Sequence, residues 1–157
     1  MSEQEQAAQA AMPVFNIEKI YLKDLSVEVP NAPQIFLEQG HPQIDVQLRN
    51  RSDAIENGIY QTVLTAEVTA KIGDKTAFVV EAHQAGIFRA QNIPQEALEP
   101  MLAVGCPNIL FPYLRETVSE AIARAGFPAL YLQPVNFEAM YLQQRAQAQG
   151  QTEQAPH

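Results

Sequence analysis

Four stretches of the chain alternate between apolar and polar residues, which is the pattern of a β-strand with one buried face. They cover residues 14–29, 44–49, 59–72 and 75–88. Lys19 and Lys23 interrupt the alternation of the first stretch, which indicates a bulge or an exposed edge strand. Gly73 and Asp74 separate the last two stretches, so these two are expected to pair through a tight hairpin turn.

The connections between the first three stretches differ in character. Residues 30–42 contain three prolines and a glycine, which predicts a long irregular loop, and long loops in small domains are often functional. Residues 50–58, NRSDAIENG, are rich in Asn, Asp, Ser and Gly. This composition is typical of turns, so the segment is interpreted as a turn between two strands.

The spacing of the apolar residues changes after residue 88. Pro94 can occupy the first turn of a short helix, and Gly105 and Pro107 are expected to end that helix. A longer helix is predicted to follow and to end before Gly126, because its apolar residues fall on one stripe. The stripe consists of Leu114, Val118, Ala121, Ile122 and Ala125. After an extended link, Asn136 is a favoured N-cap for the last helix.

Strands followed by helices predict an α+β fold, in which a four-stranded antiparallel sheet carries helices on one face. The length of 157 residues suits a single domain. We expect this domain to span residues 13–144. Residues 1–12 and 145–157 are rich in Gln, Ala and Glu and have no apolar period, so they are interpreted as disordered tails.

The net charge of −8 narrows the range of partners. Binding to nucleic acid or to an anionic membrane needs a basic surface, so neither is expected, whereas an acidic surface suits a basic protein partner. The polar N-terminus does not read as a secretory signal, and no apolar run reaches the ~18 residues of a transmembrane helix. A single cysteine excludes an internal disulfide and fits a reducing compartment, so a cytoplasmic location is expected.

Candidate catalytic chemistry is confined to a few residues. The three histidines lack metal-ligand spacing, so neither a metal nor a cofactor is expected. Cys106 could be a reactive thiol with a lowered pKa, or a small buried apolar residue, which is the commoner case. Arg115 and Glu116 could form an acid/base pair or a structural ion pair. A small enzyme that uses Cys106 or His41 with this pair is therefore an alternative to a binding protein.

Two segments are more apolar than their surroundings require. They are the loop with Ile35, Phe36 and Leu37, and the last helix with Phe137, Met140, Tyr141 and Leu142. These side chains could pack in an ordinary core. They could also line an apolar groove for extended polypeptide, because Met and aromatic residues give an adaptable surface. The sequence pattern leaves both interpretations open.

Four motifs along the chain carry a family resemblance. They are KDLSVEVPNAP (residues 23–33), TAFVVEAHQAGIF (76–88), CPNILFPYLRE (106–116) and FPALYLQPVNFEAMY (127–141). In their order and spacing they resemble the SecB family of bacterial protein-export chaperones. The resemblance covers about residues 15 to 144, and four motifs in order are far more specific than any one of them.

The resemblance implies a cytoplasmic homotetramer, a dimer of dimers, with no cofactor and no ATPase activity. SecB-like proteins hold precursor proteins unfolded and deliver them to SecA, the motor ATPase of the Sec translocase. Their sheets continue between subunits and enclose the helices, so Cys106 would be structural. A second possibility within the same fold is a SecB-like chaperone dedicated to one toxin–antitoxin pair, but the acidic residues for the motor favour the general export role.

The resemblance also implies site residues. Motor binding falls on Asp24, Glu28, Val79 and Glu81. The client-binding groove falls on Phe36, Leu37, Ile44, Val46, Phe137, Met140 and Tyr141. Subunit contacts fall on Val80, Ala82, Gln84, Cys106, Leu114, Val118 and Ile122. Many family members place a tryptophan near the end of the loop, where this chain reads EQGHP and contains no tryptophan at all.

Overall fold

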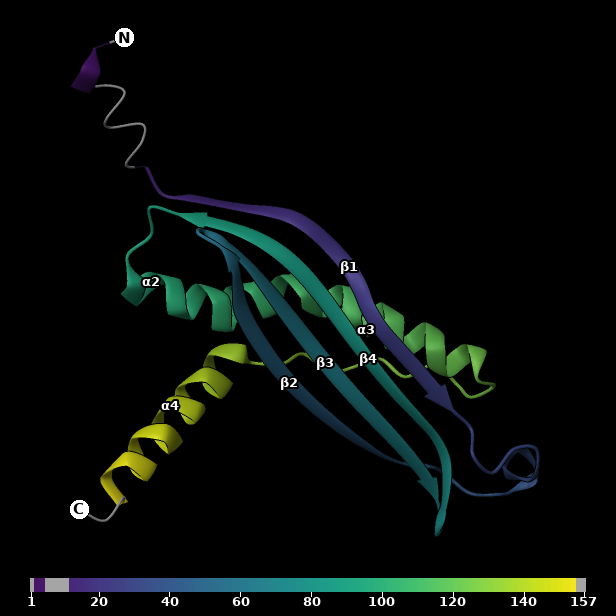
Figure 1. Ribbon diagram of the computed structural model, residues 1–157. Helices are drawn as coiled ribbons and strands as arrows, with labels where there is room; N and C mark the ends of the chain where they lie inside the picture. The colour runs from purple at the N-terminus through teal and green to yellow at the C-terminus, as the bar shows by residue number, and fades with distance from the viewer. Residues whose placement is uncertain (1, 5–11, 155–157) are drawn as a thin grey trace.

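The computed structural model describes residues 2–4 and 12–154, apart from the side chains of residues 151–154. Within these residues four antiparallel strands form one sheet in the order β1-β4-β3-β2. They are β1 (Val14–Glu28), β2 (Gln43–Glu56), β3 (Ile59–Ile72) and β4 (Lys75–Gln91). The helices lie on one side of this twisted sheet (Figure 1), which confirms the predicted α+β fold.

β1 and β2 are the two edges of the sheet. The pairing of β1 with β4 shifts register between Ile17 and Lys19 and again between Leu22 and Asp24. These shifts confirm the predicted bulge, and the place of β1 at the end of the strand order confirms the predicted edge position. β3 and β4 pair through the predicted tight turn, where Gly73 has a φ of 62°, a conformation that glycine adopts without steric cost.

The turn expected over residues 50–58 is wrong for most of its length, because β2 runs through the segment to Glu56. The polar residues that suggested a turn are bonded within the structure instead. Ser52 Oγ lies 2.7 Å from Thr62 Oγ1 on β3, and Asn50 reaches the helices below the sheet. Thr62 lies ten residues from Ser52 and Ala103 lies 53 residues from Asn50, so the composition of the segment gave no sign of these partners.

The helical segments follow the strands along the chain, after a short 3₁₀ turn in the loop, η1 (Gln34–Leu37). They are α2 (Gln95–Pro100), the π-turn η2 (Met101–Gly105), α3 (Cys106–Arg124) and α4 (Phe137–Gln154). The break expected at Gly105 and Pro107 is wrong, because α2, η2 and α3 follow one another without interruption. Pro107 has no N–H to donate to the carbonyl of Ala103, and that carbonyl accepts a hydrogen bond from Asn50 Nδ2 at 3.2 Å.

The remaining helix ends agree with the sequence. α3 ends at Arg124, and Gly126 follows with a φ of 99°. The Oδ1 atom of Asn136 accepts a hydrogen bond from the backbone N–H of Ala139 at 2.9 Å, which confirms the N-cap of α4. α4 continues to Gln154, beyond the expected domain boundary at residue 144. Most of the expected N-terminal tail, residues 1–12, lies outside the described residues.

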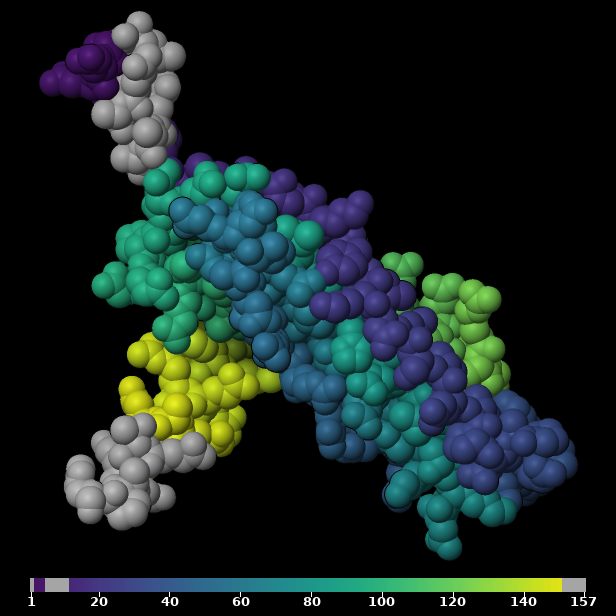
Figure 2. Space-filling view, viewed as in Figure 1, coloured from purple at the N-terminus to yellow at the C-terminus, as the bar shows by residue number. Residues whose placement is uncertain are grey.

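The core fills the space between α3 and the two central strands. Its sheet residues include Leu64, Ala66, Val68, Ala70, Phe78, Val80 and Ala82, and its α3 residues include Leu110, Leu114, Val118 and Ile122. The strand alternation and the helix stripe read from the sequence are thereby confirmed. We call the side of the sheet that faces α3 the helix side and the other the open side. Figure 2 shows the open side, which no helix of the described residues covers.

Candidate binding surfaces

The four residues expected to bind the motor lie together on the open side. Cross-strand partners point to the same side of a sheet, and the register pairs Asp24 with His83 and Glu28 with Val79. Glu81 lies on β4 between Val79 and His83 and therefore faces the same way. We call Asp24, Glu28, Val79 and Glu81 the acidic patch. Its geometry suits a basic partner, and its role in binding remains a prediction.

Two residues that the sequence did not assign hold Glu81 in place. Arg49 Nη2 lies 3.1 Å from Glu81 Oε1, and His83 Nε2 lies 3.0 Å from the same oxygen. The other ring nitrogen of His83 lies 2.9 Å from Thr65 Oγ1. The alternation of β2 indicated that Arg49 points away from the core. Its reach to Glu81 depends on the strand order, which the sequence did not provide.

The seven residues expected to line the client groove differ in exposure. Phe36, Leu37, Ile44 and Val46 expose 49%, 84%, 39% and 41% of their surface. We call these four residues the apolar rim. Phe137 and Tyr141 expose only 2% and 9%, and Met140 is partly buried. The rim is therefore available to a client, whereas the α4 residues already pack in the chain.

Ring contacts attach the two groups to opposite ends of α3. Phe36 stacks on Phe127, just past the C-terminal end of α3, with ring centroids 5.1 Å apart. Phe137 meets Phe111, in the N-terminal part of α3, edge-on at 5.9 Å. The extended link of residues 127–136 connects the two ends (Figure 1). The structure thus leaves the predicted groove residues of the loop and of β2 exposed, and it packs Phe137 of α4 against the N-terminal part of α3.

The residues expected at subunit contacts are buried within the single chain. Val80, Ala82, Cys106, Leu114, Val118 and Ile122 are each 0% exposed, and Gln84 is 4% exposed. Gln84 also donates a hydrogen bond from Nε2 to the carbonyl of Tyr21 at 3.1 Å. Direct contact with another subunit is therefore closed to these residues in this conformation. Any effect of these residues on assembly must act through the packing of β4 and α3.

A better-exposed apolar surface lies beside them on β1. Leu22, Leu25 and Val27 point to the helix side and expose 45%, 39% and 41% of their surface. Together with Ala121 and other α3 residues they line a cavity of about 410 Å³. The sequence showed their alternation, but it did not show that β1 is an edge strand that α3 leaves half covered.

The CPNILFPYLRE segment is a structural joint rather than a reactive site. Cys106 is fully buried, and burial raises the pKa of its thiol from 9.0 to about 11, which keeps it protonated at neutral pH. Arg115 Nε donates a hydrogen bond to the carbonyl of Leu132 at 2.8 Å, and its guanidinium lies 4.7 Å from the centre of the Phe111 ring. The hydrogen bond ties α3 to the extended link, and the ring contact lies within α3; both stand in place of the expected pair with Glu116.

Two other kinds of site are absent from residues 2–4 and 12–154. No group of three His, Cys, Asp or Glu residues there could hold a metal ion. No helix in that part of the chain is long and apolar enough to cross a membrane.

Comparison with known proteins places the chain in a family. The family model described as preprotein translocase subunit SecB matches residues 8–148. A protein-export protein SecB of Dechloromonas aromatica is 58% identical over 148 residues, which cover 94% of this chain and 97% of that protein. A protein-export protein SecB of Thiobacillus denitrificans is 59% identical over 142 residues, with 90% and 93% coverage.

A solved structure supports the fold. The SecB-like chaperone of Mycobacterium tuberculosis, determined in complex with a peptide from an antitoxin, matches with a TM-score of 0.63. The two chains are 19% identical, and the match covers 85% of this chain and 97% of that one. The family model and the relatives at more than half identity extend over nearly the whole sequence, and the protein belongs to the SecB family.

Proposed function

We propose that this protein is a cytoplasmic protein-export chaperone that holds unfolded precursor proteins and delivers them to the SecA motor. The observation that carries the proposal is the apolar rim, which exposes large apolar side chains beside the edge strand β2. An edge strand presents unpaired backbone groups to which an extended chain can bond, while its side chains fill apolar surface. A rim of this kind selects unfolded segments over any particular sequence.

Delivery to the motor is proposed to use the acidic patch. Asp24 and Glu28 are exposed on the open side, away from the apolar rim on the helix side. A client and the motor could therefore bind one chain together. Binding of a basic partner to exposed carboxylates should weaken as salt rises, because screening acts beyond a Debye length of about 8 Å at physiological ionic strength.

Self-association into a homotetramer is part of the proposal. The edge strand β1 and its half-exposed row Leu22, Leu25 and Val27 provide both backbone groups and apolar surface for another copy. Val27→Lys should therefore shift the molar mass measured by light scattering toward smaller species. A molar mass unchanged from four chains would exclude this edge as a subunit contact.

General export is favoured over service to one toxin–antitoxin pair. The relatives named protein-export proteins are 58% and 59% identical to this chain, whereas the SecB-like chaperone solved with an antitoxin peptide is 19% identical. The acidic patch for a motor points in the same direction.

The decisive experiment measures how well the protein suppresses aggregation of a slowly folding precursor. The double variant Phe36→Ala/Val46→Ser removes apolar surface from the rim and should lose most of this activity. Ile55→Ser is the matched control, because Ile55 is also an exposed apolar residue of β2, with 52% of its surface accessible, but lies outside the rim. Full activity of the double variant would exclude the rim as the client site.

A further inference from the structure

The open side carries a second feature next to the acidic patch, with the opposite charge. A cavity of about 440 Å³ lies there, and Lys23, Arg49, Arg51 and His83 are among its lining residues. We call these four residues and the space between them the basic hollow. Three of the ten Lys and Arg residues of the chain meet in it, although the net charge of the chain is −8.

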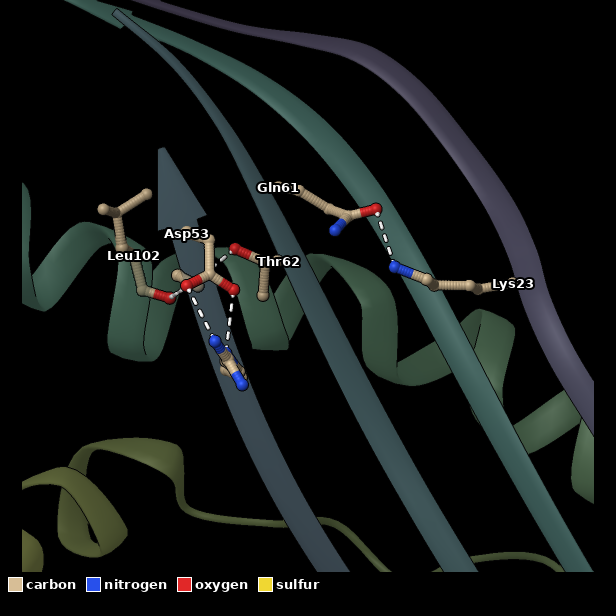
Figure 3. Close-up of polar contacts among 7 residues, drawn as sticks. Lys23, Asp53, Gln61, Thr62 and Leu102 are labelled. Carbon is tan, nitrogen blue, oxygen red and sulfur yellow. Dashed lines mark hydrogen bonds and ion pairs between the residues drawn. The ribbon is translucent and has the colours of Figure 1, made fainter. Parts of the chain in front are cut away.

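The hollow follows from the register of the sheet. Arg49 lies opposite Thr65, and Arg51 lies opposite Val63, so two short side chains of β3 form a floor beside two long ones of β2. Lys23 stands at the second bulge of β1, where the register shifts. Its ammonium reaches across β4 to within 3.4 Å of Gln61 Oε1, as the labelled pair in Figure 3 shows. Long side chains from the edge strands β1 and β2 therefore surround the short side chains of β3, which form the bottom of the hollow.

The cations of the hollow are only partly neutralised. Arg51 pairs with Asp53 at 2.8 Å, and the side chain of Arg51 remains 81% exposed. Lys23 contacts the neutral amide of Gln61, and none of the ion pairs among the described residues includes it. Arg49 is shared, because it lines the hollow and pairs with Glu81 of the acidic patch. The hollow therefore has positive charge available for a carboxylate.

We propose that the basic hollow binds an acidic side chain of the same partner segment that docks on the acidic patch. This inference rests on the proposed binding of the motor to that patch. When a basic group of the partner takes Glu81, Arg49 is released to the partner's carboxylate. One intramolecular ion pair is exchanged for two intermolecular ones.

The spacing of the two sites defines the partner segment. Glu81 and His83 are two residues apart on β4, and the cross-strand row of Arg51 meets β4 at Ala85, two residues further along. At about 3.3 Å per residue, these steps put the carboxylate about 7–13 Å from the basic group. In an extended segment that distance corresponds to about two to four residues. The open side would thus recognise a basic and an acidic residue in a fixed order and so set the direction of docking.

The proposal is tested by whether charge reversal in the hollow raises or lowers the affinity for SecA. Affinity of the full-length protein for full-length SecA is measured by titration calorimetry for Lys23→Glu, Arg51→Glu and the control Lys71→Glu. Lys71 is an exposed lysine of β3 that does not line the hollow. If only the overall electrostatic field of the chain mattered, each added negative charge would make a basic docking segment bind all three variants more tightly. The hollow predicts that Lys23→Glu and Arg51→Glu each weaken binding about fivefold to tenfold, whereas Lys71→Glu does not.

Two further measurements distinguish loss of the hollow from loss of folding. Lys23→Gln should flatten the dependence of affinity on salt, which a purely structural role of Lys23 would leave unchanged. Thermal unfolding of each variant reports any loss of folding. If reversal of the acidic patch weakens SecA binding while Lys23→Glu and Arg51→Glu strengthen it, the hollow is excluded and the proposed function stands. If reversal of the patch has no effect, the motor site and the hollow are both excluded.

Discussion

The two sides of the sheet are built from the same four strands, yet they form different kinds of surface. One cross-strand row on the helix side consists of Val27, Val80, Val68 and Val46. From one edge of the sheet to the other, these valines expose 41%, 0%, 0% and 41% of their surface. α3 covers the two central strands, so one residue type forms core in the middle of the row and accessible surface at both ends.

The open side offers the contrast. Val79 and Glu81 alternate with Val80 and Ala82 on β4, but they face away from α3 and take no part in the core. Folding therefore depends on the centre of the helix side, while the edges of that side and the whole open side remain for recognition. The apolar edge at β2 suits unfolded clients, the apolar edge at β1 suits another copy of the chain, and the charged open side suits a folded partner.

The largest expected difference is in the free energy of unfolding, between variants of the neighbouring residues Val79 and Val80. Val80→Asp would bury an unpaired charge and should reduce the free energy of unfolding by about 3–5 kcal/mol, or prevent folding. Val79→Asp makes the same chemical change on the open side and should cost less than about 1 kcal/mol. Urea unfolding of both variants measures the two values. Comparable losses would mean that the open side is also part of a core.

A smaller difference is expected within the valine row. Val68→Ala leaves a cavity at the centre and should lower the free energy of unfolding by about 2 kcal/mol. Val46→Ala at the edge should cost under about 1 kcal/mol, because the side chain is already partly in water. In the aggregation assay only Val46→Ala should lose activity per folded molecule. Equal stability losses would contradict the division of the row into core and surface.

The acidic patch should contribute to binding without contributing to folding. Combined reversal of Asp24, Glu28 and Glu81 to Lys should weaken SecA binding by roughly tenfold or more and leave the urea midpoint nearly unchanged. Calorimetry at two salt concentrations should also show that the wild-type affinity falls as salt rises. An affinity of the triple variant equal to that of the wild type would place the motor site elsewhere.

The smallest effect concerns Cys106. Below pH 9 the thiol is protonated in both the folded and the unfolded chain, so its contribution to stability is fully present. Between pH 9 and about 11 only the unfolded chain ionises, so this contribution is lost as pH rises. Alkylation at pH 7 should be slow until the chain is unfolded in urea. Rapid alkylation of the folded protein would show that Cys106 is accessible and reactive.

The sequence predicted those parts of the fold that depend on local periodicity. The strands, the α3 stripe and the N-cap at Asn136 follow from the residues in place. The continuation of β2 past Asn50 and the π-turn before Pro107 did not follow, because a contact between distant residues joins them: the amide of Asn50 donates to the Ala103 carbonyl, to which Pro107 has no N–H to donate. Such pairs join residues more than fifty positions apart.

The candidate sites show the same limit. Alternation was enough to put Asp24 and Glu28 on one face and Val79 and Glu81 on one face, and the resemblance assigned their role. The strand order was needed to bring the two pairs together and to add Arg49. It was also needed to separate a buried Val80 from a half-exposed Val27, since both read as apolar strand positions.

The assignment of clients to the helix side and the motor to the open side can be tested directly by crosslinking. A photoreactive amino acid is placed at Val46 on the apolar rim or at Val79 in the acidic patch, and each protein is irradiated with an unfolded precursor and SecA together. The residue at position 46 should crosslink to the precursor, and the residue at position 79 should crosslink to SecA. Crosslinks of the precursor at position 79, or of SecA at position 46, would contradict the division of the two sides.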